Sequence, residues 1–153
     1  MNYFKYFFLG LLLLLLFACG GVKNTIKNVD DSAPIPLLKS DNSFVITEMS
    51  PEAKYGYDKD YPINIFFRST VNDTVNQERF LKALAGPQGE KLFYKKIESC
   101  CPFPTSKSDI GAGLLDVYQV NWLGCPKPLL LYFNIYDKGK LYIPQGLTTK
   151  KPN

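Results

Sequence analysis

The chain has 153 residues and a formal net charge of +4, from 18 basic and 14 acidic side chains, and it contains no histidine. This charge is too small to predict a nucleic-acid-binding surface. The lack of histidine excludes Ser-His and Cys-His nucleophile systems and disfavours a zinc centre, whose usual ligands are cysteine and histidine. We therefore expect no catalytic residue and no metal site.

The N-terminus has the pattern of a bacterial lipoprotein signal peptide. An apolar run over residues 7–18 is interrupted only by Gly10, and it is shorter than the ~20 residues that a membrane-spanning helix needs. The run ends in Leu16-Phe17-Ala18-Cys19, which resembles a lipobox, although Phe17 is bulkier than the usual residue. We expect removal of residues 1–18 and a diacylglyceryl group and an N-acyl chain on Cys19, with no other cofactor. An ordinary secretory signal with an incidental cysteine is the alternative.

The lipid anchor predicts where the protein resides. Two or more acyl chains give stable membrane attachment, so we expect an outer-membrane protein of the cell envelope. Gly20 and Gly21 give no acidic signal for surface export, so the sequence leaves both sides of the membrane open, and of the two we expect the periplasmic side. The following stretch is polar and contains Pro34 and Pro36, so residues 19–43 are predicted to form the acylated cysteine and a flexible tether.

Aromatic and β-branched residues become frequent from residue 44 onward. A single globular domain is expected over residues 44–147, followed by a disordered tail at 148–153. Thr74 and Gln77 fit a helix-capping box, and Gly86 with Pro87 fits the end of that helix. Strands are predicted at 44–48, 63–67, 91–97, 114–122, 129–137 and 140–144. The predicted fold is α+β, an antiparallel sheet of about five to six strands with one helix packed on one face.

The alternation of side chains along residues 129–136 predicts two different faces. Leu129, Leu131, Phe133 and Ile135 suit a core, whereas Leu130, Tyr132, Asn134 and Tyr136 suit a half-wet surface. Tyr55, Tyr57, Tyr61, Tyr132 and Tyr136 are interpreted as a candidate recognition surface, because tyrosine is favoured at interfaces. The alternative is that these tyrosines only cover a half-buried sheet. Asp116 alternates with apolar neighbours, which predicts an outward-facing charge; a buried carboxylate with a role is the alternative.

Cys100 and Cys101 are adjacent, and with Cys19 acylated they leave Cys125 as a third thiol. In a simple meander, Cys125 and the pair lie at opposite ends of the sheet, too far apart for the ~7 Å that a disulfide requires between α-carbons. A crossover through residues 102–113 would permit that pairing. We favour the meander, which leaves a vicinal disulfide that stiffens the loop, two packed thiols, or a reactive dithiol. The usual redox spacing Cys-x-x-Cys is absent.

Several segments together resemble a known group of proteins. They are SPEAKYGY at 50–57, ERFLKALAGPQGE at 78–90, SCCPF at 99–103, LLDVYQV at 114–120, LYFNIYD at 131–137 and PQGL at 144–147. They resemble small Bacteroidota lipoproteins, mostly flavobacterial, of unknown function, which often carry the name 2-dehydro-3-deoxyphosphooctonate aldolase. The resemblance implies an envelope location. The aldolase activity is not carried over, because that enzyme is a (β/α)₈ barrel, a fold that needs ~200 residues or more.

The sequence therefore predicts a non-catalytic accessory lipoprotein that binds another envelope protein, through the tyrosine-bearing face or the loop at 100–112. No nucleic acid and no small-molecule substrate are expected. A thiol-dependent redox factor using Cys100 or Cys101, or an immunity or inhibitor protein, are the alternatives.

Overall fold

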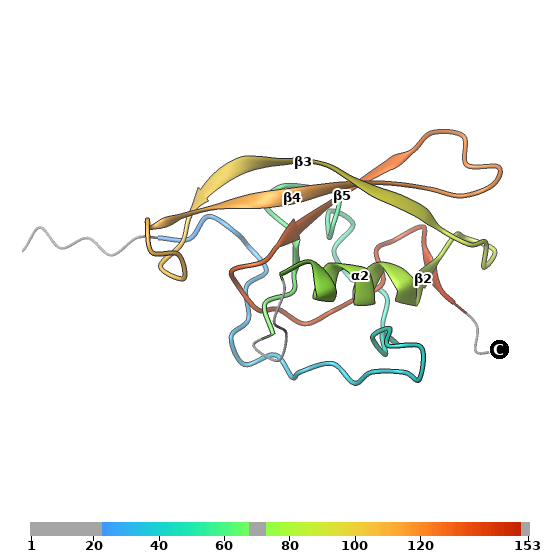
Figure 1. Cartoon of the computed structure of the whole chain (residues 1–153), viewed down its shortest axis with the longest axis horizontal. Helices are drawn as coiled ribbons and strands as arrows, with labels where there is room; N and C mark the ends of the chain where they lie inside the picture. Colours follow the sequence, from blue (N-terminus) through green and yellow to red (C-terminus); the bar gives the residue numbers. More distant parts are fainter. Residues whose placement is uncertain (1–22, 68–72, 151–153) are drawn as a thin grey trace, which may run out of the picture.

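The computed structural model describes residues 23–67 and 73–150, so the predicted signal peptide and Cys19 lie outside the described part of the chain. This part of the chain forms one helix, α2, and six strands, of which β3, β4 and β5 are the longest (Figure 1). In chain order they are β1 (Ile63–Asn64), α2 (Asp73–Ala83), β2 (Leu84–Ala85), β3 (Phe93–Pro104), β4 (Ala112–Asn121), β5 (Leu129–Asn134) and β6 (Thr148–Thr149).

The main sheet has four strands in the order β1-β5-β4-β3. Strands β3, β4 and β5 form the expected antiparallel meander, while β1 pairs with β5 in parallel. Strands β2 and β6 form a separate antiparallel pair. The predicted α+β class is confirmed, with two corrections: one pairing is parallel, and the strands divide into two sheets.

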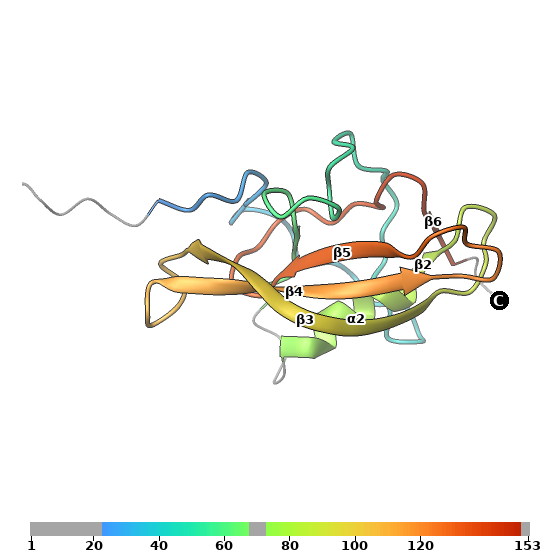
Figure 2. The same cartoon turned by 90° about the horizontal axis from the view of Figure 1, so that it is seen from above.

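Helix α2 lies against one face of the main sheet, as Figures 1 and 2 show. Its buried side chains Phe80 and Leu81 face the sheet, and the Phe80 ring meets Phe133 of β5 edge to face at 5.7 Å between centroids. Leu131 and Phe133 are fully buried in this core, as the alternation along 129–136 predicts. The helix ends at Ala83, earlier than expected, because Leu84–Ala85 leaves it to pair with Thr148–Thr149.

Chain outside the predicted domain packs on the other face of the sheet. Ile26 is buried together with Phe103 of β3 and Leu115 of β4, and Lys27 N donates a backbone hydrogen bond to Asp60 O at 2.8 Å. Residues 24–33 therefore lie against the domain instead of forming part of a flexible tether. The composition argument missed this because a few well-placed side chains are enough to hold the segment.

Other predicted boundaries also differ from the structure. The expected disordered tail is ordered up to residue 150, since Thr148–Thr149 forms β6 and Lys150 N donates to Ala83 O. The expected strands at 44–48 and 140–144 reduce to isolated bridges, Leu38 with Phe44 and Met49 with Ile143. Each of these segments pairs with its neighbour at a single residue and does not extend into a longer strand.

Candidate functional site

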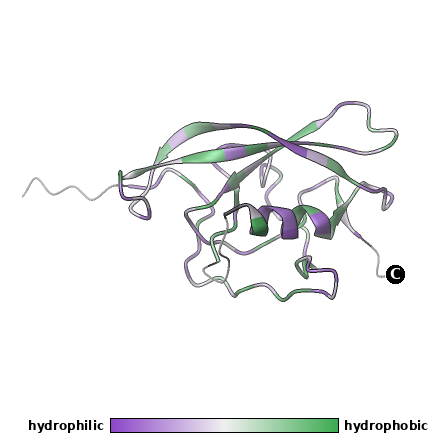
Figure 3. Ribbon diagram, in the orientation of Figure 1, coloured by the Kyte–Doolittle hydropathy of each residue, from purple (hydrophilic) through white to green (hydrophobic). Residues whose placement is uncertain are grey.

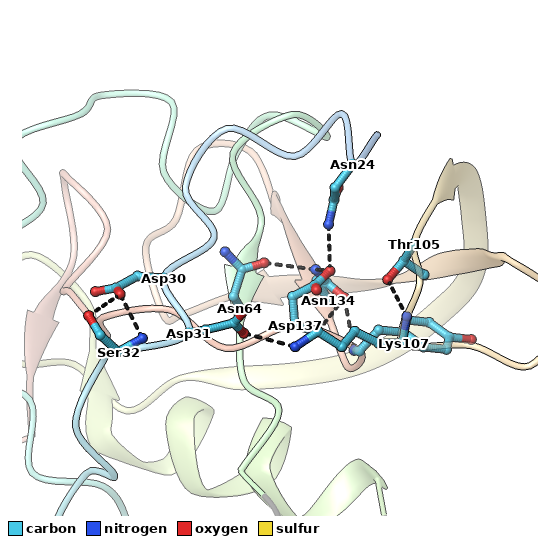
Figure 4. A network of polar contacts seen from close by, with 10 residues as sticks. Asn24, Asp30, Asp31, Ser32, Asn64, Thr105, Lys107, Asn134 and Asp137 are labelled. Carbon is cyan, nitrogen blue, oxygen red and sulfur yellow. Dashed lines mark hydrogen bonds and ion pairs between the residues drawn. The ribbon is translucent and has the colours of Figure 1, made fainter. Parts of the chain in front are cut away.

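One end of the domain is built where the N-terminal segment meets the turn between β3 and β4. Residues 24–33 and the β3–β4 turn at 104–111 lie at the same end of the molecule in Figures 1 and 2. We call these two segments together the anchor end. Asn24 Nδ2 donates to Asp137 Oδ2 at 2.8 Å, and Lys107 Nζ lies 3.0 Å from Asp31 Oδ1. Figure 4 shows both contacts. The first described residues are therefore tied to the domain at a defined place.

A buried amide cluster supports this attachment. Asn134 Nδ2 donates to Asn64 Oδ1 and to Asp137 Oδ2, and Asn134 Oδ1 accepts from the backbone N–H groups of Tyr136 and Asp137. Asn64, Asn134 and Asp137 are all buried. Because a buried polar group without a partner is costly, these mutual bonds fix Asp137 in the position from which it accepts Asn24.

Cys100 and Cys101 form a disulfide between neighbouring residues, with their Cα atoms 3.7 Å apart. The pairing register of β3 and β4 shifts between Cys100 and Phe103, so the disulfide lies in a β-bulge. Cys101 has a φ of 58°, a left-handed conformation that costs roughly 1–2 kcal/mol for a residue other than glycine. Of the three interpretations left open by the sequence, the structure has the vicinal disulfide.

Cys125 lies away from this pair, as the meander predicts. Cys100 pairs with Leu115, whereas Cys125 follows Asn121, which pairs with Phe93 at the far end of β3. The six residues from Leu115 to Asn121 span about 20 Å at ~3.3 Å per residue. Cys125 is the cysteine outside a disulfide among the described residues, and its thiol donates to Lys127 O at 3.1 Å.

A groove of about 460 Å³ runs beside the disulfide. One wall is formed by Cys101, Pro102 and Phe103, and the other by Thr25, Ile26, Lys27, Lys59 and Asp60. Both lysines are exposed. The groove therefore belongs to the anchor end, and its lining combines apolar side chains with Lys27, Lys59 and Asp60.

A second candidate site is a small hairpin that exposes apolar side chains. Leu37 O accepts from Val45 N at 2.8 Å, and Lys39 N donates to Ser43 O across the turn. Asn42 occupies a left-handed conformation with φ 64°, which asparagine tolerates better than most residues. Phe44 N donates to Arg79 O at 3.1 Å, and this bond fastens the hairpin to helix α2.

The exposed side chains of this element define what we call the apolar hairpin: Ile35, Leu37, Leu38 and Val45. Ile35 is 64% and Leu37 is 74% exposed. Figure 3 shows green stretches on the chain below the helix, where this segment runs. Clustered exposed apolar residues mark interaction surfaces, whereas single ones are ordinary.

An open groove of about 710 Å³ adjoins the turn of the apolar hairpin. We call it the α2–β3 groove; its lining includes Asp41 of the hairpin turn, Lys82 of α2, Lys91 and Tyr94 near the start of β3, and Lys150. Lys150 Nζ lies 3.6 Å from Asp41 Oδ2. The groove therefore adjoins the turn of the apolar hairpin at Asp41 and adds positively charged groups at that point.

Asp116 is buried, which corrects the expectation of an outward-facing charge. Its Oδ2 accepts from Gln77 Nε2 of α2 at 2.7 Å, and its Oδ1 accepts from Ser99 Oγ at 2.7 Å and lies 2.6 Å from Lys96 Nζ. Burial raises the pKa of Asp116, but the hydrogen bonds from Lys96, Gln77 and Ser99 outweigh it and hold the pKa below its usual range. All of its contacts are internal, so we interpret Asp116 as a residue that joins α2 to the sheet.

The predicted tyrosine surface is not a single surface in the structure. Tyr55 is buried in the main core, where its hydroxyl oxygen accepts from Tyr142 N at 3.2 Å and burial raises the hydroxyl pKa. Tyr57 is half-buried and donates to Gln145 O, and desolvation raises its pKa to about 12. Tyr132 and Tyr136 pack instead on the cluster of Ile26, Phe103 and Leu115. The prediction is therefore wrong for Tyr55. Tyr57 packs on the main core, Tyr132 and Tyr136 pack on the second cluster, and Tyr61 belongs to neither cluster and has Lys54 Nζ 5.7 Å from its ring centroid.

The apolar hairpin was missed because its residues lay inside the segment interpreted as a tether. The sequence signal was the run Ile35-Pro36-Leu37-Leu38, followed by the turn-forming residues 39–43.

For residues 23–67 and 73–150, no helix has the length and hydrophobicity that a membrane crossing requires. In the same ranges, no group of three or more potential ligand side chains is placed to hold a metal ion.

Comparison with models of protein families, with curated proteins and with solved structures found no match to this chain.

Proposed function

We propose that this chain is a lipid-anchored envelope protein, attached to the outer membrane on its periplasmic side through Cys19, and that it acts as a non-catalytic binding module for another envelope protein. The observation that carries the binding role is the apolar hairpin, which exposes large side chains on a backbone that is held in place. A surface of this kind loses less conformational entropy on binding than a mobile loop would.

The chemistry of the surface indicates the chemistry of the partner. The turn of the apolar hairpin adjoins the α2–β3 groove at Asp41, and that groove is lined by Lys82, Lys91 and Lys150 and by the acidic Asp41 and Glu90. A partner segment with apolar side chains and at least one carboxylate would complement it. Protein interfaces commonly have such an apolar centre and a charged rim.

Internal contacts of the polar residues support a role without catalysis. Asp116 is hydrogen-bonded to Gln77 and Ser99 and paired with Lys96. Asn134 and Asp137 are hydrogen-bonded to each other within the amide cluster. The resemblance to the small Bacteroidota lipoproteins that share the SCCPF segment agrees with this proposal and stays a prediction. The expectation that the protein binds neither nucleic acid nor a small-molecule substrate also stays a prediction.

Site-specific photo-crosslinking in mildly solubilised membranes tests the proposal. A photoreactive residue at Leu37 should capture one defined envelope protein, and Leu37→Asp in the same chain should abolish capture from a second probe at Val45. A probe at Leu123 is the matched control, since Leu123 is 88% exposed but lies on the β4–β5 turn. Equal capture from Leu37 and Leu123, or recovery of this chain alone, would count against the proposal.

The vicinal disulfide favours one alternative, a thiol-dependent redox factor that uses Cys100 and Cys101. Its sulfur atoms lie in half-buried residues beside the groove at the anchor end. If this alternative holds, the disulfide exchanges with a dithiol partner, and Cys101→Ser abolishes function while leaving partner capture at Leu37 intact. An immunity or inhibitor protein would differ from the main proposal only in the identity of its partner.

A further inference from the structure

The described chain starts close to the predicted anchor, and this restricts how far the domain can move from the membrane. Asn24 is bonded to Asp137 and Ile26 is buried against Phe103 and Leu115. Four residues lie between Cys19 and Asn24, and the five steps from one Cα atom to the other span at most about 18 Å even when the chain is fully extended. If Cys19 carries acyl chains, Asn24 therefore stays within that distance of the lipid headgroups.

The β3–β4 turn shares this end of the domain with Asn24. Lys107 of the turn pairs with Asp31 of the N-terminal segment at 3.0 Å, and Phe103 at the base of the turn packs on Ile26. In Figure 4, Lys107 of the turn reaches Asp31 and Asn24 points toward Asp137, so both contacts involve the N-terminal segment. A bilayer held near Asn24 is therefore also near the tip of the turn.

The tip of the turn presents one apolar side chain on a defined backbone. Ile110 is 85% exposed, while Thr105 N donates to Gly111 O and Gly111 N donates to Ser108 O around it. Gly111 has a φ of 72°, which closes the turn. Lys107 of the same turn is exposed, as are Lys27 and Lys59 of the groove beside the disulfide, and these side chains suit the phosphate level of a membrane.

From the chain length, the fixed position of Asn24 and the exposure of Ile110, we infer that the β3–β4 turn contacts the bilayer and inserts Ile110 at the boundary between headgroups and acyl chains. The occupant of this surface is lipid, not protein. The inference rests on the proposed function, because it requires acylation of Cys19. It adds an orientation: the vicinal disulfide and its groove face the membrane, and the start of β3 points away from it.

A fluorescence experiment on the full acylated protein tests this orientation. Ile110→Cys and Leu123→Cys are each made in a Cys125→Ser background and labelled with an environment-sensitive fluorophore; the thiol of Cys19 is blocked by its lipid and Cys100–Cys101 is a disulfide. Both sites are exposed turn tips, at opposite ends of the sheet. The proteins are placed in vesicles of phosphatidylethanolamine and phosphatidylglycerol that carry lipid with a spin label high on its acyl chain.

We expect at least about twofold stronger quenching at position 110 than at position 123, because interfacial insertion reaches about 5–10 Å into the boundary region. Equal quenching in a protein whose acylation is verified by mass spectrometry overturns the inference and leaves the proposed function standing. An unmodified Cys19 overturns both. Paramagnetic broadening of the Ile110 and Leu123 methyl signals in the chain with its native side chains gives the same comparison without labels, and equal broadening likewise overturns the inference.

Discussion

Asp116 links helix α2 to strands β3 and β4, and replacing it tests whether that link stabilises the fold. In Asp116→Ala, the Nε2 group of Gln77 loses its acceptor, as do Ser99 Oγ and Lys96 Nζ. Gln77 is fully buried, whereas the Lys96 side chain is 40% exposed and Ser99 is exposed. The lost bonds are therefore unequal in cost, because only the exposed groups regain water.

The magnitude follows from this difference in burial. A buried donor without a partner costs about 1–3 kcal/mol, and the exposed ion pair contributes below about 1 kcal/mol. We therefore expect Asp116→Ala to lower the free energy of unfolding by about 2–4 kcal/mol. The matched control Lys96→Gln removes the exposed partner alone and should cost less than about 1 kcal/mol.

Equilibrium urea unfolding, followed by the fluorescence of the single tryptophan Trp122, measures both changes. The pH dependence gives a second test. Because the folded pKa of Asp116 is below its usual value, its stabilising contribution is present above the unfolded pKa of about 3.9 and is lost as the pH falls through the folded value. Equal costs for Asp116→Ala and Lys96→Gln, or the same acid sensitivity in Asp116→Ala as in the unmodified protein, would refute this reasoning.

Three further changes test the core, the bulge and the anchor. Phe80→Ala should cost about 3–5 kcal/mol in urea unfolding because the ring is fully buried, while Phe93→Ala, which removes an exposed ring, should cost less than about 0.5 kcal/mol. In a Cys100→Ser background, Cys101→Gly should be more stable than Cys101→Ser by about 1 kcal/mol, because glycine adopts a positive φ freely; equal stability would contradict a strained residue at this position. Cys19→Ser should move the protein from the membrane fraction to the soluble fraction, and unchanged fractionation would contradict lipid anchoring.

The sequence predicted the parts of the fold that depend on strong periodicity. The alternation around Leu131 and Phe133 identified a buried face correctly, and the spacing of turns predicted a meander that separates Cys125 from Cys100. Both patterns extend over a long stretch of chain and depend on the period-two geometry of a strand. The helix was found for a similar reason, although its end was misplaced where Leu84–Ala85 joins β6.

The candidate sites were harder to predict because they depend on contacts between distant segments. Tyr55 lies in a loop rich in turn residues, and it is a core residue because distant parts of the chain, Tyr142 among them, pack against it. The polarity of residues 20–43 indicated disorder, whereas Ile26 and Ala33 fill specific gaps. Asp116 is buried because Gln77 of α2 binds it together with Lys96 and Ser99, and no local pattern places a helix side chain over a particular strand residue.

The attachment of residues 24–33 also determines how the protein responds to mechanical load. If Cys19 carries acyl chains, as we propose, tension on them would enter the domain at Asn24 and then reach the bonds of Lys27 to Asp60 and of Asp30 to Lys138 one after another. Contacts loaded in sequence unzip at lower force than strands sheared together, so this segment should peel away while the main sheet stays intact. If residues 24–33 were released, the chain between Cys19 and the sheet would lengthen by up to about 35 Å, and the core of the domain would stay folded.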